Sequence, residues 1–162
     1  MPTLPVPHVD PSLEALLPAT AGGITLEKWS WTLATYIDSS QGGDRNLYAK
    51  WLVPFGLTTD KVDMGIATDI TKTENLVVEA IRVPGIDSGT LTTSFAKTAR
   101  DDGWPVSSVT ILGKPLVKIT DPAADAAGSA LSAAYIFAKG NVLYLIVTDD
   151  QQLLGEVVIK LA

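Results

Sequence analysis

The uninterrupted apolar run at residues 142–147 is six residues long, and no apolar run in the chain is longer. A membrane-spanning helix needs about 20 apolar residues, so a run this short fits a strand and predicts no membrane span. Both side-chain parities of the run are apolar, which is typical of a strand with no face toward water. We therefore expect residues 142–147 to form a central strand of a sheet that is covered on both faces.

Alternation of apolar and polar residues predicts the other strands, and short turn sequences join them in pairs. The predicted hairpins are 62–70 with 76–83, 109–112 with 116–120, and 134–138 with 142–147. A first strand is expected over 24–31, where Ile24 and Trp29 fall on opposite parities and indicate a bulge near Lys28. Successive hairpins of this kind predict a mainly antiparallel sheet.

Amphipathic segments predict the helices, and each is preceded by an aspartate that can cap its first turn. The predicted caps are Asp44, Asp87 and Asp149, and the helices run to Phe55, Ala99 and Leu161. Residues 33–37 fit either a helix or a strand, and residues 121–128 read as a flexible loop. The predicted order is β-α-β-β-α-β-β-β-β-α, an α+β fold with about three helices on one face of the sheet.

Proline is frequent in the first 22 residues of the chain, with Pro2, Pro5, Pro7, Pro11 and Pro18. Proline fixes φ and donates no hydrogen bond, so the segment predicts a Pro-rich N-terminal tether with at most a turn of helix at 12–17. Such a tether can hold the domain off a surface; the alternative is an ordered arm that lies on the domain. Residues 23–162 then form one α+β domain, and the tether is expected to add little to its stability.

Composition excludes several classes of function. The chain has no cysteine and one histidine, His8, which removes disulfides, thiolate metal sites and multi-histidine centres. A serine-histidine-acid triad is disfavoured for the same reason. The formal net charge is −6 and the basic residues occur singly, so we expect no nucleic-acid partner. The common nucleotide, zinc-protease, hydrolase and calcium motifs do not occur, and we expect no cofactor.

Carboxylates offer the catalytic chemistry that remains. Asp63 and Asp69 on one predicted strand, with Glu79 on its partner, can fall on the same polar side of a hairpin. Paired acids can act as general acid and base or hold a hard cation. The alternative is a solvated sheet face, which the alternation alone explains. We adopt that alternative and expect neither enzymatic activity nor a bound metal.

Tryptophan provides the candidate contact residues. Trp29 and Trp31 share one side of the first predicted strand, an arrangement on which sugar rings or a partner protein can stack. Core packing is the alternative for this pair. Trp104 lies in a loop before Pro105 and is a third candidate, whereas Trp51 falls on the apolar stripe of a helix and is expected in the core.

Three segments of the sequence resemble domains of uncharacterised secreted or lipid-anchored bacterial proteins. They are LPATAGGITL at 17–26, GKPLVKITDP at 113–122 and YIFAKGNVLYLIVTDDQQLL at 135–154. The resemblance covers most of residues 17–162 and rests on the sequences of predicted hairpins. It implies an exported, extracytoplasmic α+β protein, and it implies no activity and no site residues. Residues 1–7 carry neither the basic region nor the apolar region of a signal peptide.

These observations leave three hypotheses for the function. The first is a non-catalytic extracytoplasmic binding or protein-interaction module that contacts a protein partner or a cell-surface component through Trp29, Trp31 and Trp104. The second is a structural or assembly subunit that self-associates through sheet edges or the N-terminal arm. The third is a carboxylate-dependent hydrolase.

Overall fold

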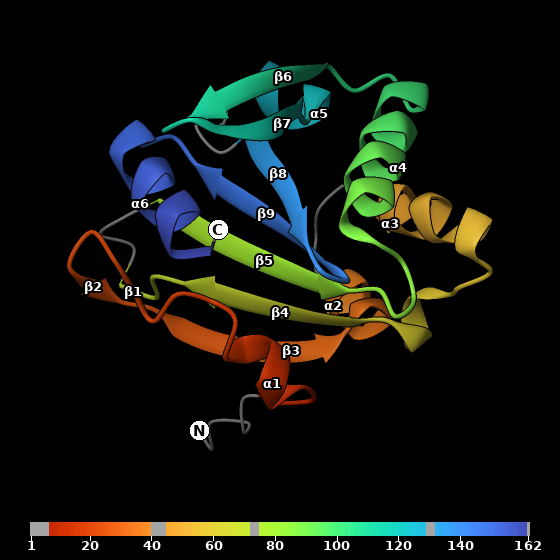
Figure 1. Ribbon diagram of the computed structural model, residues 1–162, viewed down its shortest axis with the longest axis horizontal. Helices are drawn as coiled ribbons and strands as arrows, with labels where there is room; N and C mark the ends of the chain where they lie inside the picture. The colour runs from red at the N-terminus through yellow and green to blue at the C-terminus, as the bar shows by residue number, and fades with distance from the viewer. Residues whose placement is uncertain (1–6, 40–44, 72–74, 129–131, 162) are drawn as a thin grey trace.

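A seven-stranded antiparallel sheet forms the centre of the structure (Figure 1). The computed structural model describes residues 7–39, 45–71, 75–128 and 132–161. The strands follow the order β3-β4-β5-β9-β8-β7-β6 across the sheet. Their bounds are β3 (Glu27–Thr32), β4 (Asp63–Thr68), β5 (Leu76–Arg82), β6 (Val106–Ile111), β7 (Lys114–Thr120), β8 (Ala133–Lys139) and β9 (Val142–Thr148). The predicted α+β class with a mainly antiparallel sheet is confirmed.

Strand β9 lies in the middle of this sheet, as its apolar sequence predicts. It pairs with β5 on one side and with β8 on the other. Residues 142–146 are all buried. Leu143 and Leu145 belong to the hydrophobic core on one face, and Tyr144 and Ile146 belong to the core on the other. The strand is therefore covered on both faces.

Helices lie against both of these faces. On one face are α2 (Leu33–Ser39), α3 (Arg45–Leu52) and α4 (Ser88–Asp101), which enclose what we call the α4 core. On the other are α1 (Pro11–Glu14) and α6 (Gln151–Leu161), which enclose the α6 core. Of the three predicted helices, α3 and α4 share one face as expected, and the expectation is corrected for α6. Apolar side chains on both faces of β9 need cover on both.

Some boundaries differ from the sequence predictions because local caps decide them. A short helix, α5 (Pro122–Ala126), replaces the flexible loop expected over 121–128, since the Asp121 carboxylate accepts hydrogen bonds from two backbone amides of the first turn. In α6 the capping carboxylate belongs to Asp150 rather than Asp149, and it accepts from the Gln152 amide at 2.8 Å.

The first predicted strand and the first predicted helix also differ in detail. Strand structure is interrupted at Leu26 rather than near Lys28, and the ambiguous residues 33–37 belong to α2. Two 3-10 helices, η1 (Val53–Phe55) and η2 (Thr59–Lys61), connect α3 to β4. The predicted cap Asp44 lies outside the described residues. Trp51 is fully buried, as expected of a core residue.

Residues 7–22 form an ordered arm on the domain. The arm contains α1 and the strand β1 (Thr20–Ala21), which pairs with β2 (Ile24–Thr25). Leu13 and Leu17 are 0% and 3% exposed and belong to the α6 core. An added Cβ on Gly65 of β4 would lie 3.3 Å from each of these side chains. The predicted tether is therefore corrected for residues 7–22, because a spacing of four directs both leucines into the core between the prolines.

Asp10 fastens the start of this arm to the sheet. Its carboxylate caps α1 by accepting a hydrogen bond from the Leu13 amide at 2.9 Å, and it accepts another from the Ser12 hydroxyl at 2.6 Å. The Arg82 guanidinium of β5 donates to it at 2.5 Å. Burial raises the pKa of Asp10, but these hydrogen bonds and the charge of Arg82 outweigh burial and hold the pKa below its usual value.

Asp10→Asn is expected to lower stability at neutral pH and to leave stability in acid unchanged. Asparagine caps a helix about as well as aspartate, so the substitution removes mainly the charge that faces Arg82. The pKa of Asp10 is lower in the folded than in the unfolded chain. Its contribution is therefore complete above the unfolded value of about 3.9 and is lost as the pH falls through the folded value.

Urea unfolding as a function of pH measures this contribution. We expect the variant to lose about 1–2 kcal/mol at pH 7 and the loss to shrink below about pH 4. Asp38→Asn, an exposed position at the end of α2, serves as the control. A loss that stays constant from neutral pH to strong acid would contradict the prediction.

Candidate functional site

The predicted contact residues Trp29, Trp31 and Trp104 lie on one face of the sheet, the face of the α4 core. Trp29 and Trp31 are on the edge strand β3, and the cross-strand partner of Trp31 is Met64, which belongs to that core. Trp104 directly precedes β6, the strand at the opposite edge, and packs against the same core. All three side chains are half-buried, so each keeps an accessible surface.

A third aromatic ring extends the tryptophan pair on β3. The ring centroids of Trp29 and Trp31 are 6.3 Å apart, and those of Trp31 and Tyr36 are 6.0 Å apart. Tyr36 belongs to α2, which follows β3 directly. Sequence reasoning misses Tyr36 because residues 33–37 fit a helix or a strand, and the helix brings this ring back to Trp31.

Glu79 is the buried polar group of this face. It lies on β5, is 7% exposed, and sits in register between Ile66 of β4 and Leu145 of β9. The Tyr36 hydroxyl donates to one carboxylate oxygen at 2.8 Å, and the Tyr48 hydroxyl donates to the other at 3.2 Å. A buried carboxylate needs such donors, because burial without them costs several kcal/mol by the usual order of magnitude. Glu79 thus ties α2 and α3 to the centre of the sheet.

A cavity of about 70 Å³ adjoins Glu79 between the sheet and α4. Its lining includes Tyr48, Glu79, Phe95, Trp104 and Val147. Trp104 and Val147 are half-buried whereas Tyr48, Glu79 and Phe95 are buried, so the cavity leads from accessible residues to the carboxylate. This volume holds a few water molecules or the terminal group of a larger molecule. The cavity therefore connects the accessible ring of Trp104 with the polar centre of the same face.

The structure separates the three predicted carboxylates. Asp63 is the cross-strand partner of Arg82 and faces α1, on the opposite side of the sheet from Glu79. Burial and the nearby charge of Asp10 raise the pKa of Asp63, although Arg82 lowers it. Asp69 follows the end of β4, where its carboxylate accepts from the Thr71 amide at 2.8 Å. The prediction that these three acids can share one polar side of a hairpin is therefore wrong.

The solvated sheet face assumed for these acids is also corrected. Asp69 is 5% exposed and Glu79 is 7% exposed, so both are buried. Glu79 is enclosed because helices also cover its face of the sheet, and strands covered on both faces leave no side toward water. Alternation along β4 and β5 indicates which residues share a face of the sheet. It does not indicate that the face carrying Glu79 is buried beneath helices.

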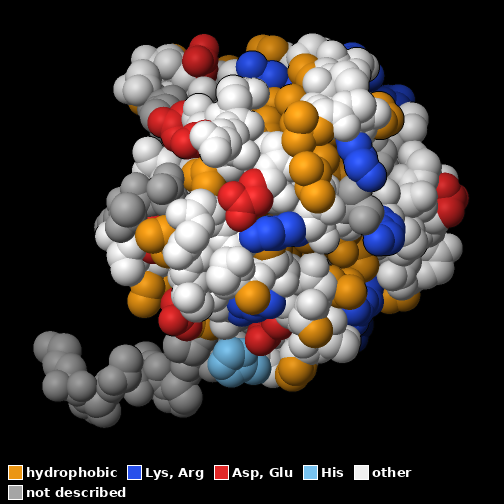
Figure 2. Space-filling model, turned by 60° about the vertical axis from the view of Figure 1, so that its left-hand side comes forward, with side chains coloured by type: hydrophobic (Ala, Val, Ile, Leu, Met, Phe, Trp, Pro, Cys, Tyr) orange, Lys and Arg blue, Asp and Glu red, His pale blue; other side chains and the backbone are white. Residues whose placement is uncertain are grey.

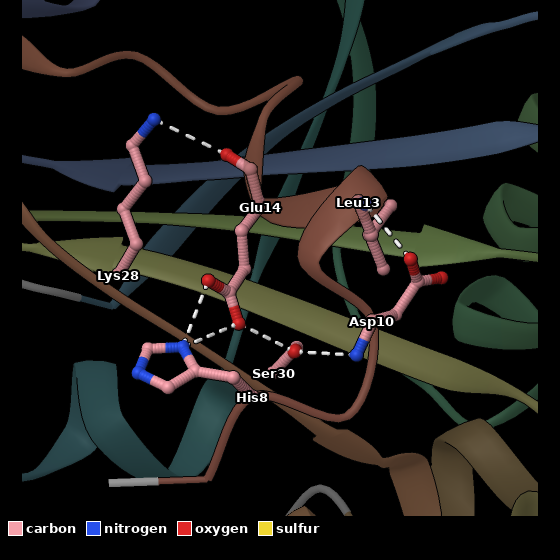
Figure 3. Close-up of polar contacts among 6 residues, drawn as sticks. All are labelled: His8, Asp10, Leu13, Glu14, Lys28 and Ser30. Carbon is pink, nitrogen blue, oxygen red and sulfur yellow. Dashed lines mark hydrogen bonds and ion pairs between the residues drawn. The ribbon is translucent and has the colours of Figure 1, made fainter.

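A cluster in the arm brings together a histidine, a glutamate and a serine (Figure 3). The Glu14 carboxylate contacts His8 Nδ1 at 2.9 Å and accepts from the Ser30 hydroxyl at 2.6 Å. In a hydrolase triad the serine bonds to the histidine, whereas here the carboxylate lies between them and Ser30 is fully buried. Asp10 donates its amide to the Ser30 hydroxyl at 2.8 Å, and Lys28 donates to the Glu14 carbonyl at 3.1 Å. The cluster fastens the arm to β3.

The chain matches no protein-family model, no curated protein and no solved structure. Among the described residues, no group of three or more histidine, aspartate and glutamate side chains could hold a metal ion. Within the same part of the chain, no helix is long and apolar enough to cross a membrane. The resemblance to exported bacterial proteins stays a prediction, and so do the contact roles of Trp29, Trp31 and Trp104.

Proposed function

We propose that the protein is a non-catalytic, extracytoplasmic binding or protein-interaction module. Its partner is a protein or a cell-surface component, which it binds through an aromatic face made of Trp29, Trp31, Tyr36 and Trp104. The observation that carries this proposal is the row of half-buried rings on β3 and α2, with successive centroids 6.3 and 6.0 Å apart. Large aromatic side chains that keep an accessible surface on a rigid sheet are typical anchors of binding interfaces.

The rigidity of this face supports a binding role. Tyr36 is held by its hydrogen bond to Glu79, and Trp31 contacts Tyr36, so the rings are positioned before any partner arrives. Preorganised side chains lose little conformational entropy on binding, which favours affinity. The same carboxylate of Glu79 is used in holding the tyrosines, and Asp63 faces the opposite side of the sheet. Asp63 and Glu79, two of the three acids in the carboxylate-hydrolase hypothesis, therefore do not face one substrate together.

Site-specific photo-crosslinking tests where the partner binds. A photoreactive phenylalanine analogue placed at Trp31 should give a defined crosslinked product in the cells that produce the protein. The matched control places the analogue at Val53, which is 70% exposed and lies in η1, away from β3. The same products from both positions would contradict a binding role for the aromatic face.

The affinity of the partner identified in this way then measures the contribution of each ring. Trp29→Ala and Trp31→Ala should each weaken binding by about tenfold or more, as hot-spot aromatic residues do. Val53→Ala should leave the dissociation constant unchanged. Thermal unfolding must be recorded for each variant, because both tryptophans are half-buried and their removal can lower stability. Unaltered affinity in folded tryptophan variants would refute the proposal.

The alternative function is a structural subunit that self-associates through sheet edges or the N-terminal arm. The arm pairs with β3 of its own chain: the Val9 amide donates to the Ser30 carbonyl at 3.2 Å, and the Ser30 amide donates to the Pro7 carbonyl at 3.1 Å. This edge is therefore partly occupied within one molecule. Sedimentation over a range of concentrations distinguishes the alternatives, since an assembly subunit forms larger species as concentration rises and the binding module stays monomeric.

A further inference from the structure

The two edges of the large sheet differ in how they are covered. Along β3 the arm forms a parallel bridge between His8 and Ser30, and Glu27 and Lys28 add charges to the strand. In the part of the chain that the structure describes, β6 at the other edge pairs with β7 alone. The free edge of β6 therefore presents backbone groups to which another strand can bind.

The sequence of β6 lacks the features that block pairing at an edge. Natural edge strands carry lysine, proline or bulges that prevent another strand from adding. Strand β6 reads VSSVTI and contains no charge, no proline and no glycine. Its Ser107, Ser108 and Thr110 side chains are exposed, small and compatible with a neighbouring strand. The edge is suited to accept an extended segment.

A cavity of about 350 Å³ lies between the end of β6 and α6. Its lining includes Thr110, Ile111, Leu112, Gln152, Gly155 and Glu156. On α6 a Cβ added to Gly155 would lie 3.0 Å from Leu112 Cδ1, so glycine is what lets the β6–β7 turn come this close to the helix. Figure 2 brings the α6 side forward and shows hydrophobic groups between interspersed acidic and basic side chains.

Leu112 is an unusual residue for its position at this cavity. Its φ is +49° and the next residue, Gly113, has φ +77°, so both central residues of the turn are left-handed. Asparagine, aspartate and glycine are favoured there, and a leucine strains the backbone in this conformation. Leu112 is nevertheless 65% exposed. An exposed apolar side chain in a strained turn is explained if it contacts a ligand in the adjoining cavity.

We propose that β6 and α6 form a groove that binds an extended peptide segment of a partner protein by strand addition. Backbone hydrogen bonds to β6 hold the peptide, and one apolar side chain of the peptide enters the cavity beside Leu112 and Gly155. The peptide is neutral or basic, because the chain has a net charge of −6; Glu156 beside the cavity is itself paired with Lys160 at 2.7 Å. This groove lies at the opposite edge of the sheet from Trp29, Trp31 and Tyr36, whereas Trp104 of the aromatic face directly precedes β6.

The experiment uses two synthetic heptapeptides and the full chain labelled with ¹⁵N. The first peptide alternates threonine and valine, ends in leucine, and carries one lysine. The second has glutamate in place of each threonine. Chemical shifts give the affinity, and hydrogen exchange shows whether amides of β6 become protected. Strand addition protects alternate amides along β6 from exchange. A peptide that contacts the protein through side chains alone does not protect these amides.

Two variants of α6 test the position of the groove. Gln152→Trp fills the cavity from an exposed position, whereas Ile159→Trp adds the same ring at a residue of the same helix that is 61% exposed and not among those lining the cavity. Gln152→Arg adds a positive charge instead of volume, and it provides a second test should the tryptophan variant fail to fold. Both changes at Gln152 should weaken binding of the basic peptide by about tenfold, and Ile159→Trp should leave its dissociation constant unchanged.

The expected result is a dissociation constant between about 1 μM and 1 mM for the basic peptide, with at least tenfold weaker binding of the acidic one. Protection of alternate β6 amides must accompany binding. Shifts confined to Trp29, Trp31 and Tyr36, equal affinity for both peptides, or no binding at millimolar concentration would each overturn the proposal. Self-association of the protein through β6 that excludes the peptide would also overturn it, since a second copy would then be the occupant.

Discussion

Replacing Leu13 with alanine is expected to lower the free energy of unfolding by about 2–5 kcal/mol, as large-to-small changes in a core do. Leu13 is 0% exposed and packs over Gly65, so its removal leaves a cavity between the arm and β4. In a domain of this size the melting temperature should fall by roughly 4–20 °C. Urea unfolding and thermal unfolding followed by circular dichroism measure the two quantities.

Leu16→Ala is the matched control for Leu13→Ala. Leu16 lies three residues further along the chain, follows α1 and is 44% exposed, so its loss should change stability by less than about 0.5 kcal/mol. Deleting residues 1–18 removes both Leu13 and Leu17 and should destabilise the protein at least as much as Leu13→Ala. A truncated protein that melts at the temperature of the full chain would show that the arm is not part of the core.

Leu145→Ala and Leu154→Ala are each expected to cost about 2–5 kcal/mol, and they report on opposite faces of the sheet. Leu145 is 4% exposed in the α4 core, and Leu154 is 0% exposed in the α6 core. Equilibrium unfolding in urea measures both losses. Ile159→Ala, on the same helix as Leu154 but 61% exposed, is the control and should be close to neutral. A loss below about 0.5 kcal/mol for both leucines would mean that the wrong side chains have been placed inside.

Much of the sheet can be predicted from the sequence because its signals are local. The predicted segments 76–83 and 134–138 differ from β5 and β8 by a residue at their ends. Alternation marks the strands, and turn glycines mark where they reverse: Gly140 has φ +61° between β8 and β9. Asp87 caps α4 as predicted, since its carboxylate accepts from the Thr90 amide at 2.9 Å.

The arrangement of these elements depends on contacts that local patterns do not encode. Pairing of β5 with β9 joins residues 60 to 72 positions apart in the sequence, and nothing in either strand specifies the other. The face on which α6 packs follows from this pairing. The arm is a similar case, because the prolines are an obvious local signal, whereas the close packing of Leu13 over Gly65 becomes visible only when β4 is in place.

The candidate site was predictable only in part, for the same reason. A spacing of two residues places Trp29 and Trp31 on one side of a strand, and the structure has them so. The hydrogen bonds of Glu79 come from Tyr36 and Tyr48, which are 43 and 31 residues away in the sequence. A lone glutamate in an alternating strand looks like a solvated residue unless its distant donors are known.

The place of β9 at the centre of the sheet has a consequence for synthesis of the chain. Strand β5 ends at residue 82 and its partner β9 begins at residue 142, so about 60 residues must be added before β5 can pair on that side. At typical translation rates of about 5–20 residues per second this takes roughly 3–12 s. Throughout that interval the nascent chain carries an apolar strand with an open edge, which can pair with other chains. Translation products that stop before residue 142 should therefore be the species most prone to aggregate during expression.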